Sequence, residues 1–407
     1  MIYYLLFSFL IFYFVNRVFN LRNLFNPFIF IVVFHFIFFY IGLFYKDIYT
    51  HIVIENKTIF LINYSFFSIL IGGILSRFLV QKLGVSYVKF PESSINLSIN
   101  HKITIVGFLF LIFGIMCTFK FVYDVGGFII FMKDVENVRI RAREGKGLIS
   151  QLALNFFTFG LLTILMAKIS KMIKFLLTLM VFFFVLSFGN RGPALFLVVF
   201  IIYIIQAVNR KQFSFKKIAI AAVALFSLMV FFGALRTNYE ADLSKLFKAR
   251  FAWRPFVNIQ NFQYVIDFFP KKYDFLLGKT YLVDFSMLLP GSHPNSGTFL
   301  KELMGFSFDG GSITPSYLGI SYVNFGVYGL VFSPLLLGFL SNLFYEVYLS
   351  KFDLKIPSNL ILLILISFNF GAVVTSGVMT VLIQNMTVIF LVYFLYIGLV
   401  KLLYALK

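Results

Sequence analysis

The amino-acid sequence predicts an all-α polytopic integral membrane protein with about 11 transmembrane helices. Its 407 residues are 60% hydrophobic and only 13% charged, whereas a soluble domain carries about 45–50% apolar and about 25% charged residues. A spanning helix needs roughly 20 apolar residues, so this content suffices for about ten to twelve spans. The low charge density excludes a conventional soluble enzyme. The single cysteine, Cys117, excludes a secreted disulfide scaffold.

Continuous apolar runs give the expected spans in order along the chain. The first run has no basic residue ahead of it and no small-residue cleavage site, so we expect a helix and not a removed signal peptide. All the spans are expected to belong to one membrane domain, residues 1–407. The spans cover residues 2–15, 27–45, 58–76, 103–122, 148–167, 173–188, 193–208, 217–235, 316–345, 357–375 and 378–400.

Basic residues are shared unevenly between the two sets of connections. One set, from Arg17 to Lys407, holds 17 basic and three acidic residues and a net charge of +14. The other set has a net charge of +5, mostly in two longer loops, which count less toward topology. The positive-inside rule therefore places the N-terminus outside and the C-terminus in the cytoplasm. Most of the formal charge of +19 is this topology signal, so no nucleic-acid partner is expected.

The first long outer connection, residues 123–147, is expected to be an amphipathic loop. Arg139, Arg141 and Arg143 alternate there with small or apolar residues, ahead of a glycine-rich turn. This pattern is typical of a short helix that lies in the interface and contacts lipid headgroups. A functional surface helix is the alternative interpretation.

The second outer connection, residues 236–315, is a large extracytoplasmic loop. Loops of this length are functional or disordered, and the only tryptophan, Trp253, together with many phenylalanines argues against disorder. From Leu243 to Phe269 the pattern predicts an amphipathic helix, which Pro270 ends. We expect this loop to lie on the outer surface and to cap a cavity in the helical bundle.

Four arginines lie on the predicted outer side and are therefore not explained by the positive-inside rule. Arg191 lies in a tight outer turn, and Arg236 lies at the outer end of the eighth span. Arg250 and Arg254 are four residues apart, so they share one face of a helix. An arginine at membrane depth by default marks a functional site, and the guanidinium group matches the oxygens of phosphate. Together they predict a pyrophosphate site; snorkelling of each side chain to the interface is the alternative.

The end of the large loop, residues 281–315, carries candidate general bases. Its glycine and proline residues indicate a loop of defined shape, and it contains Asp284, His293 and Asp309. Histidine and carboxylate side chains are the usual proton acceptors of enzymes. A solvated loop histidine is the alternative for His293, whereas His35 lies mid-span and is expected to be packed.

Several common sites are missing from the sequence. No cluster of His, Cys, Asp and Glu has the spacing of metal ligands, so no metal is expected. Residues 189–192 lack the Gly-Lys-Ser/Thr of a nucleotide-binding P-loop. No cofactor is expected, and a transfer reaction would therefore need a donor that is already activated.

Short motifs make the chain similar to the O-antigen polymerase family, the oligosaccharide repeat-unit polymerases of the Wzy type. The matching stretches are Phe188-Gly189-Asn190-Arg191-Gly192-Pro193, the position of Arg236, Gly311-Ser312-Ile313-Thr314-Pro315-Ser316-Tyr317-Leu318-Gly319 and Tyr322-Val323-Asn324-Phe325-Gly326-Val327-Tyr328-Gly329-Leu330. The many spans and the large outer loop in the C-terminal half also fit. The last of these stretches is the most telling.

This resemblance implies a membrane-embedded, GT-C-like glycosyltransferase in the bacterial inner membrane, with its active site on the outer face. Such enzymes transfer a growing glycan from undecaprenyl pyrophosphate to the non-reducing end of an incoming lipid-linked repeat unit. The arginines would then hold pyrophosphate, and His293, with Asp284 and Asp309 behind it, would take the proton. Trp253 and Tyr317 would contact sugar rings. Lipid-linked oligosaccharides, membrane lipid, a chain-length regulator and a flippase are the expected partners.

Two other functions remain open at this stage. A flippase for lipid-linked oligosaccharides also needs many spans and a basic cavity, but it is expected to have mid-span charges and two related halves. An O-antigen ligase uses the same donor with lipid A-core as the acceptor. Its outer loop usually carries a more distinctive histidine motif than this sequence has.

Overall fold

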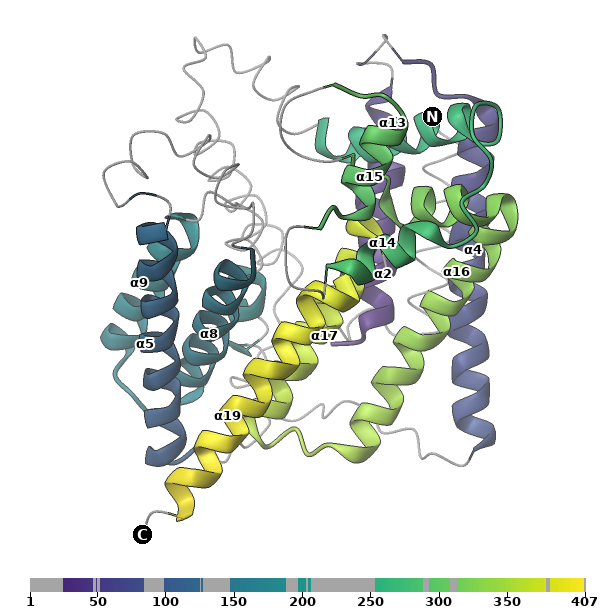
Figure 1. Cartoon of the computed structure of the whole chain (residues 1–407). Coiled ribbons are helices and arrows are strands. Elements are labelled where there is room, and N and C mark those ends of the chain that lie inside the picture. Colours follow the sequence, from purple (N-terminus) through teal and green to yellow (C-terminus); the bar gives the residue numbers. More distant parts are fainter. Residues whose placement is uncertain are drawn as a thin grey trace. The chain divides into compact units, whose positions relative to one another are not determined.

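The computed structural model describes residues 25–46, 49, 52–83, 99–124, 126, 147–187, 197–202, 204–205, 253–287, 293–307, 313–377 and 381–405. All the regular elements in these ranges are helices (Figure 1). Seven of them are long and apolar enough to cross a membrane. These candidate spans are Pro27–Phe44, Asn56–Lys82, His101–Asp124, Leu148–Met166, Ser316–Lys351, Pro357–Ser376 and Thr387–Ala405.

Each of these seven helices falls on a span predicted from the sequence, so a polytopic helical membrane protein is confirmed. An eighth helix, α9 (Lys171–Ser187), also falls on a predicted span, and residues 197–202 are helical within the span predicted at 193–208. The spans predicted at 2–15 and 217–235 lie outside the described residues. The total of 11 spans therefore stays a prediction.

The chain divides into two compact units. Unit 1 comprises Met1–Phe90, Phe226–Lys351 and Ile366–Gln384, and unit 2 comprises Pro91–Leu225, Phe352–Leu365 and Asn385–Lys407. Helix α17 (Pro357–Ser376) contributes to both, and the π-helical segment η4 (Val381–Met386) follows it. A single membrane domain over residues 1–407 stays a prediction, as does the amphipathic loop at 123–147, most of which lies outside the described residues.

Unit 2 is built on an antiparallel pair of helices, α5 (His101–Asp124) and α8 (Gly147–Met166). Small residues let the two backbones approach, because a Cβ added at Gly160 would lie 2.8 Å from the carbonyl oxygen of Gly107. Helix α19 (Thr387–Ala405) joins the pair, and the hydroxyl of Thr163 donates a 3.1 Å hydrogen bond to that of Tyr396. This unit is a bundle of spans.

Unit 1 has a span with a π-helical turn at its centre. Helix α2 (Pro27–His35), the π-helical turn η1 (Phe36–Tyr40) and helix α3 (Ile41–Phe44) follow one another without a break. Asn26 caps the start, where its side-chain oxygen accepts the N–H of Phe28 at 2.9 Å. A π-helical turn inside an α-helix is frequent at functional sites.

Helices α4 (Asn56–Lys82) and α16 (Ser316–Lys351) form the closest helix pair of the described part of unit 1 and lie side by side in Figure 1. A Cβ added at Gly72 would lie 2.0 Å from the carbonyl oxygen of Leu335, and one at Gly338 would lie 2.2 Å from that of Ile69. Only glycine allows this approach. The two helices run parallel, as expected for spans that both enter from the outer side.

Helix α16 is kinked at Gly326, which adopts φ 59° and ψ −140°. Residues with a side chain rarely adopt such a conformation. The ring of Phe275 also fills the space beside this glycine, because an added Cβ would lie 2.8 Å from its Cζ atom. The kink therefore requires glycine for both reasons.

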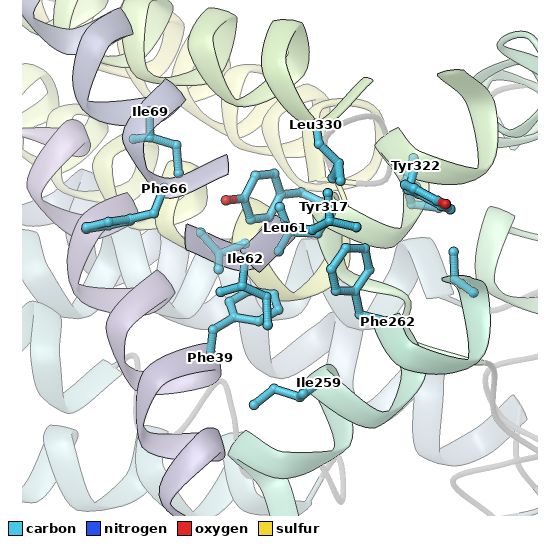
Figure 2. Packing of buried hydrophobic residues seen from close by; sticks show 14 of the residues in the cluster. Phe39, Leu61, Ile62, Phe66, Ile69, Ile259, Phe262, Tyr317, Tyr322 and Leu330 are labelled. Atoms are coloured by element: carbon cyan, nitrogen blue, oxygen red, sulfur yellow. The ribbon is translucent and has the colours of Figure 1, made fainter. Parts of the chain in front are cut away.

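The end of the large loop folds into helices α13 (Trp253–Phe268), α14 (Lys279–Ser286) and α15 (Ser296–Leu303). A helix is confirmed in the described part of the predicted range, and Pro270 follows its end as predicted; its position on the outer surface stays a prediction. Helix α13 also enters the core. Figure 2 shows Ile259 and Phe262 of this helix in one cluster with Phe66 and Tyr317.

Candidate functional site

The helices of the large loop and the ends of three spans meet at one end of unit 1. Helix α13 packs against α3, η1, α4 and α16, and α14 packs against α15 and α16. We call the described residues of 253–315 the loop layer. The layer lies at the N-terminal ends of α4 and α16, which the predicted topology places on the outer side; which end faces outside stays a prediction.

Gln263 fixes α13 to the start of α4. Its side-chain oxygen accepts the hydroxyl of Thr58 at 2.5 Å and the backbone N–H of Glu55 at 3.1 Å. Its amide nitrogen donates to the carboxylate of Asp267 at 3.1 Å. The Gln263 side chain is buried, and buried polar groups of this kind hold a segment in one position because breaking them leaves unpaired groups behind.

Asn324 fixes the loop layer to the kink of α16. Its side-chain oxygen accepts the N–H of Gly278 at 3.0 Å, and its amide donates to the hydroxyl of Thr280 at 2.5 Å. The N–H of Leu276 also donates to the carbonyl of Val323 at 2.8 Å. The stretch from Tyr322 to Leu330, on which the family resemblance mainly rests, thus forms the kink and its attachment to the loop.

Asp284 is a buried carboxylate at the end of α14, with an exposed fraction of 1%. It accepts the backbone N–H of Ser296, the first residue of α15, at 2.7 Å. Asn295 caps the same helix by accepting the N–H of Thr298 at 2.8 Å. These two bonds fix the segment that carries His293, so the contacts support a positioning role for Asp284. Its predicted catalytic role is untested.

His293 is half-buried in the segment that precedes α15. Asp309 lies outside the described residues. Whether His293, Asp284 and Asp309 act together therefore stays a prediction.

The four arginines of the predicted pyrophosphate site lie largely outside the described residues. This holds for Arg191, Arg236 and Arg250. The backbone of Arg254 belongs to the first turn of α13, and its side chain is outside the description. Their role stays a prediction.

Trp253 begins α13 within a small aromatic cluster. Its ring meets that of Tyr49 edge-to-face at 5.2 Å, and Tyr49 stacks on Phe256 at 4.6 Å. Burial, and then the phenol of Tyr45, raise the pKa of Tyr49. Trp253 itself is half-buried, and its predicted contact with sugar rings stays a prediction.

Tyr317 lies in the core at the start of α16, with an exposed fraction of 0%. Its hydroxyl and Nδ1 of His35 form a 2.8 Å hydrogen bond. The His35 ring also lies 4.8 Å from the rings of both Phe39 and Phe66, so His35 is packed as expected. The sugar-binding prediction for Tyr317 is untested, and its burial favours an anchoring role.

The contacts of Gln263, Asn324 and His35 could not be predicted from the sequence, because each joins residues far apart in the chain. Of these three residues, only Asn324 lies in a motif that the sequence singled out. That motif did not indicate which residues Asn324 contacts. In the described part of the chain, no group of three or more His, Cys, Asp or Glu side chains has the arrangement to hold a metal ion.

The described helices define a multi-pass helical membrane protein in which α13, α14 and α15 pack near the ends of the candidate spans of unit 1. The family model described as "Putative O-antigen polymerase" matches residues 23–354. The chain therefore belongs to the O-antigen polymerase family. Membership indicates a glycosyltransferase-like polymerase role with lipid-linked oligosaccharide substrates. Searches of curated proteins and of solved structures gave no significant match.

Proposed function

We propose that this protein polymerises oligosaccharide repeat units carried on undecaprenyl pyrophosphate, on the outer face of the bacterial inner membrane. The observation that carries the proposal is the extent of the family match, residues 23–354. The match includes the first described spans, all residues from 236 to 315 and the whole of α16. The packing of the loop layer against α3, α4 and α16 gives further support.

The proposed reaction is a single glycosyl transfer in a membrane-embedded, GT-C-like architecture. A hydroxyl at the non-reducing end of the incoming unit attacks the anomeric carbon of the growing glycan. A new glycosidic C–O bond forms, and the C–O bond to the carrier breaks with release of undecaprenyl pyrophosphate. The acceptor proton passes to a base, and the electron pair leaves with the diphosphate, so no nucleotide is consumed.

The arginines and the loop bases have separate roles in this proposal. Arg191, Arg236, Arg250 and Arg254 bind pyrophosphate and neutralise the charge that develops on the leaving group. Electrostatic stabilisation of this kind is usually the largest single contribution to catalysis. His293 takes the proton, with Asp309 as the second candidate base. Asp284 holds the segment of His293 through Ser296.

The acceptor distinguishes this proposal from its alternatives. The purified protein is given lipid-linked repeat units, with no nucleotide, and released undecaprenyl pyrophosphate is counted against glycosidic bonds formed. Polymerase activity predicts one carrier released for each bond, with repeat units as acceptors. Transfer to lipid A-core alone would indicate a ligase. Movement of the lipid-linked oligosaccharide across liposomes, without carrier release, would indicate a flippase.

A further inference from the structure

One face of α13 combines aromatic rings with amide groups. Trp253, Gln260 and Tyr264 are seven and four residues apart, so they lie along one face of the helix. The first and the last of these are eleven positions apart, a distance of about 16 Å at the rise of an α-helix. This face belongs to the loop layer.

Gln260 has a buried acceptor without a partner among the described residues. Its exposed fraction is 8%, and its amide nitrogen donates to the hydroxyl of Tyr264 at 3.0 Å. Its side-chain oxygen, Oε1, has no hydrogen-bond partner in the described structure. Leaving a buried acceptor unpaired is unfavourable, and such groups are paired in most proteins. A hydroxyl group from a ligand would satisfy this oxygen.

Half-buried aromatic rings continue from Tyr264. The ring of Tyr264 lies 5.5 Å from that of Phe306, which lies 6.2 Å from Phe268. Phe268 is nearly parallel to Tyr273, at 6.3 Å and 4°. All four residues are half-buried and pack against the hydrophobic core of unit 1. We call Tyr264, Phe268, Tyr273 and Phe306 the aromatic strip.

A neighbouring amide secures the other edge of this face. Asn261 donates to the carbonyl and to the hydroxyl of Thr314, at 3.1 and 3.3 Å. This bond ties α13 to the segment that leads into α16. The amide end of the face is therefore fixed in place before any ligand arrives, and preorganisation of this kind favours binding.

From Gln260 and the aromatic strip we infer a binding subsite for the glycan chain on α13. Binding sites typically combine aromatic surface with a few well-placed polar groups, and sugar rings offer both apolar faces and hydroxyls. The inference rests on the proposed function, because it names the part of the glycan substrate that this face holds. It assigns to this face a direct contact with the sugar chain.

Gln260→Met and Phe306→Leu test the subsite. Gln260→Met keeps the length of the side chain but removes the acceptor, and Phe306→Leu removes a ring. The probe is the polysaccharide made by cells that contain this protein, released from its lipid carrier by mild acid. Its affinity for the full-length protein in detergent is measured through the fluorescence of Trp253, the only tryptophan, and checked by calorimetry.

We expect each variant to bind the lipid-free polymer about tenfold more weakly, the effect of losing one good polar or ring contact. Phe306→Tyr, which keeps the ring, should retain binding. Matched controls in unit 2 are Gln151→Met and Tyr123→Leu, the latter 79% exposed; both should bind normally. In polymerisation, the two test variants should raise KM for repeat units and change kcat less than twofold.

Two outcomes would overturn the subsite. One is a wild-type protein that does not bind lipid-free polymer. The other is a pair of variants that lose thermal stability but keep their affinity, which would make the strip an aromatic anchor at the membrane interface. Failure of the proposed function would give a different result from failure of the subsite. The polymer would then bind through Gln260 and Phe306, but the protein would join no repeat units.

Discussion

The hydroxyl of Tyr317 and Nδ1 of His35 form a buried 2.8 Å hydrogen bond between residues 282 positions apart. The bond joins the end of α2, just before its π-helical turn, to the start of α16. Both residues are fully buried. The exit of the large loop is therefore tied to the first described span.

Tyr317→Phe should destabilise the protein by about 1–3 kcal/mol, because it leaves a buried imidazole nitrogen without its partner. Thermal unfolding in detergent measures the effect. Tyr328→Phe is the matched control, since Tyr328 is in the same helix and 76% exposed. If both variants unfolded at the wild-type temperature, the bond would not hold α16 in place.

Gly326→Ala should destabilise the kink of α16 by about 1–3 kcal/mol, through backbone strain at positive φ and overlap with Phe275. The loop layer should also become more accessible to protease, since it attaches beside this kink. Gly398→Ala is the control, because no atom lies within 4 Å of an added Cβ there. Equal stability of the two variants would contradict the geometry described for Gly326.

Asp284→Asn separates positioning from proton transfer. An amide oxygen still accepts the N–H of Ser296, so we expect Asp284→Asn to keep most of the polymerisation rate. Asp284→Ala removes the acceptor, and we expect a loss of about 1 kcal/mol of stability, as for a lost helix cap, with a lower rate. A complete loss of activity in Asp284→Asn, with normal stability, would instead make Asp284 the base.

Gln263→Leu should release α13 from the start of α4. The substitution leaves the buried hydroxyl of Thr58 unpaired, which costs about 1–3 kcal/mol. Amide hydrogen exchange in α13 should be faster in the variant than in the wild type. Exchange in α5, a helix of unit 2, should be the same in both proteins. Uniform exchange in the variant and the wild type would mean that apolar packing alone holds the helix.

The elements that depend on a local pattern of residues could be predicted from the sequence. Apolar runs marked the spans, and Pro270 marked the end of the amphipathic helix, because each signal lies within a few residues of the feature it predicts. The pattern did not reveal that Ile259 and Phe262 enter the core, because an amphipathic helix on a membrane surface has the same periodicity.

Hydrogen-bond partners that are far apart in the chain could not be predicted from the sequence, for a physical reason. A mid-span histidine is compatible with many packed environments, and nothing near His35 identifies Tyr317 as its partner. Asp284 was equally ambiguous, since a carboxylate in a loop is suited to proton transfer and to accepting a backbone N–H. The predicted roles of Arg191, Arg236 and Arg250 await measurement.

The most direct test of the proposed polymerase is a gel of products from synthetic undecaprenyl-pyrophosphate-linked repeat units and purified protein. We predict a ladder without added nucleotide or metal, lost in Arg191→Ala and Arg236→Ala but kept in Arg210→Ala, whose arginine lies in a connection expected to be cytoplasmic. No ladder from the wild-type protein, together with transport of the same lipid-linked units across liposomes, would contradict the proposal and indicate a flippase.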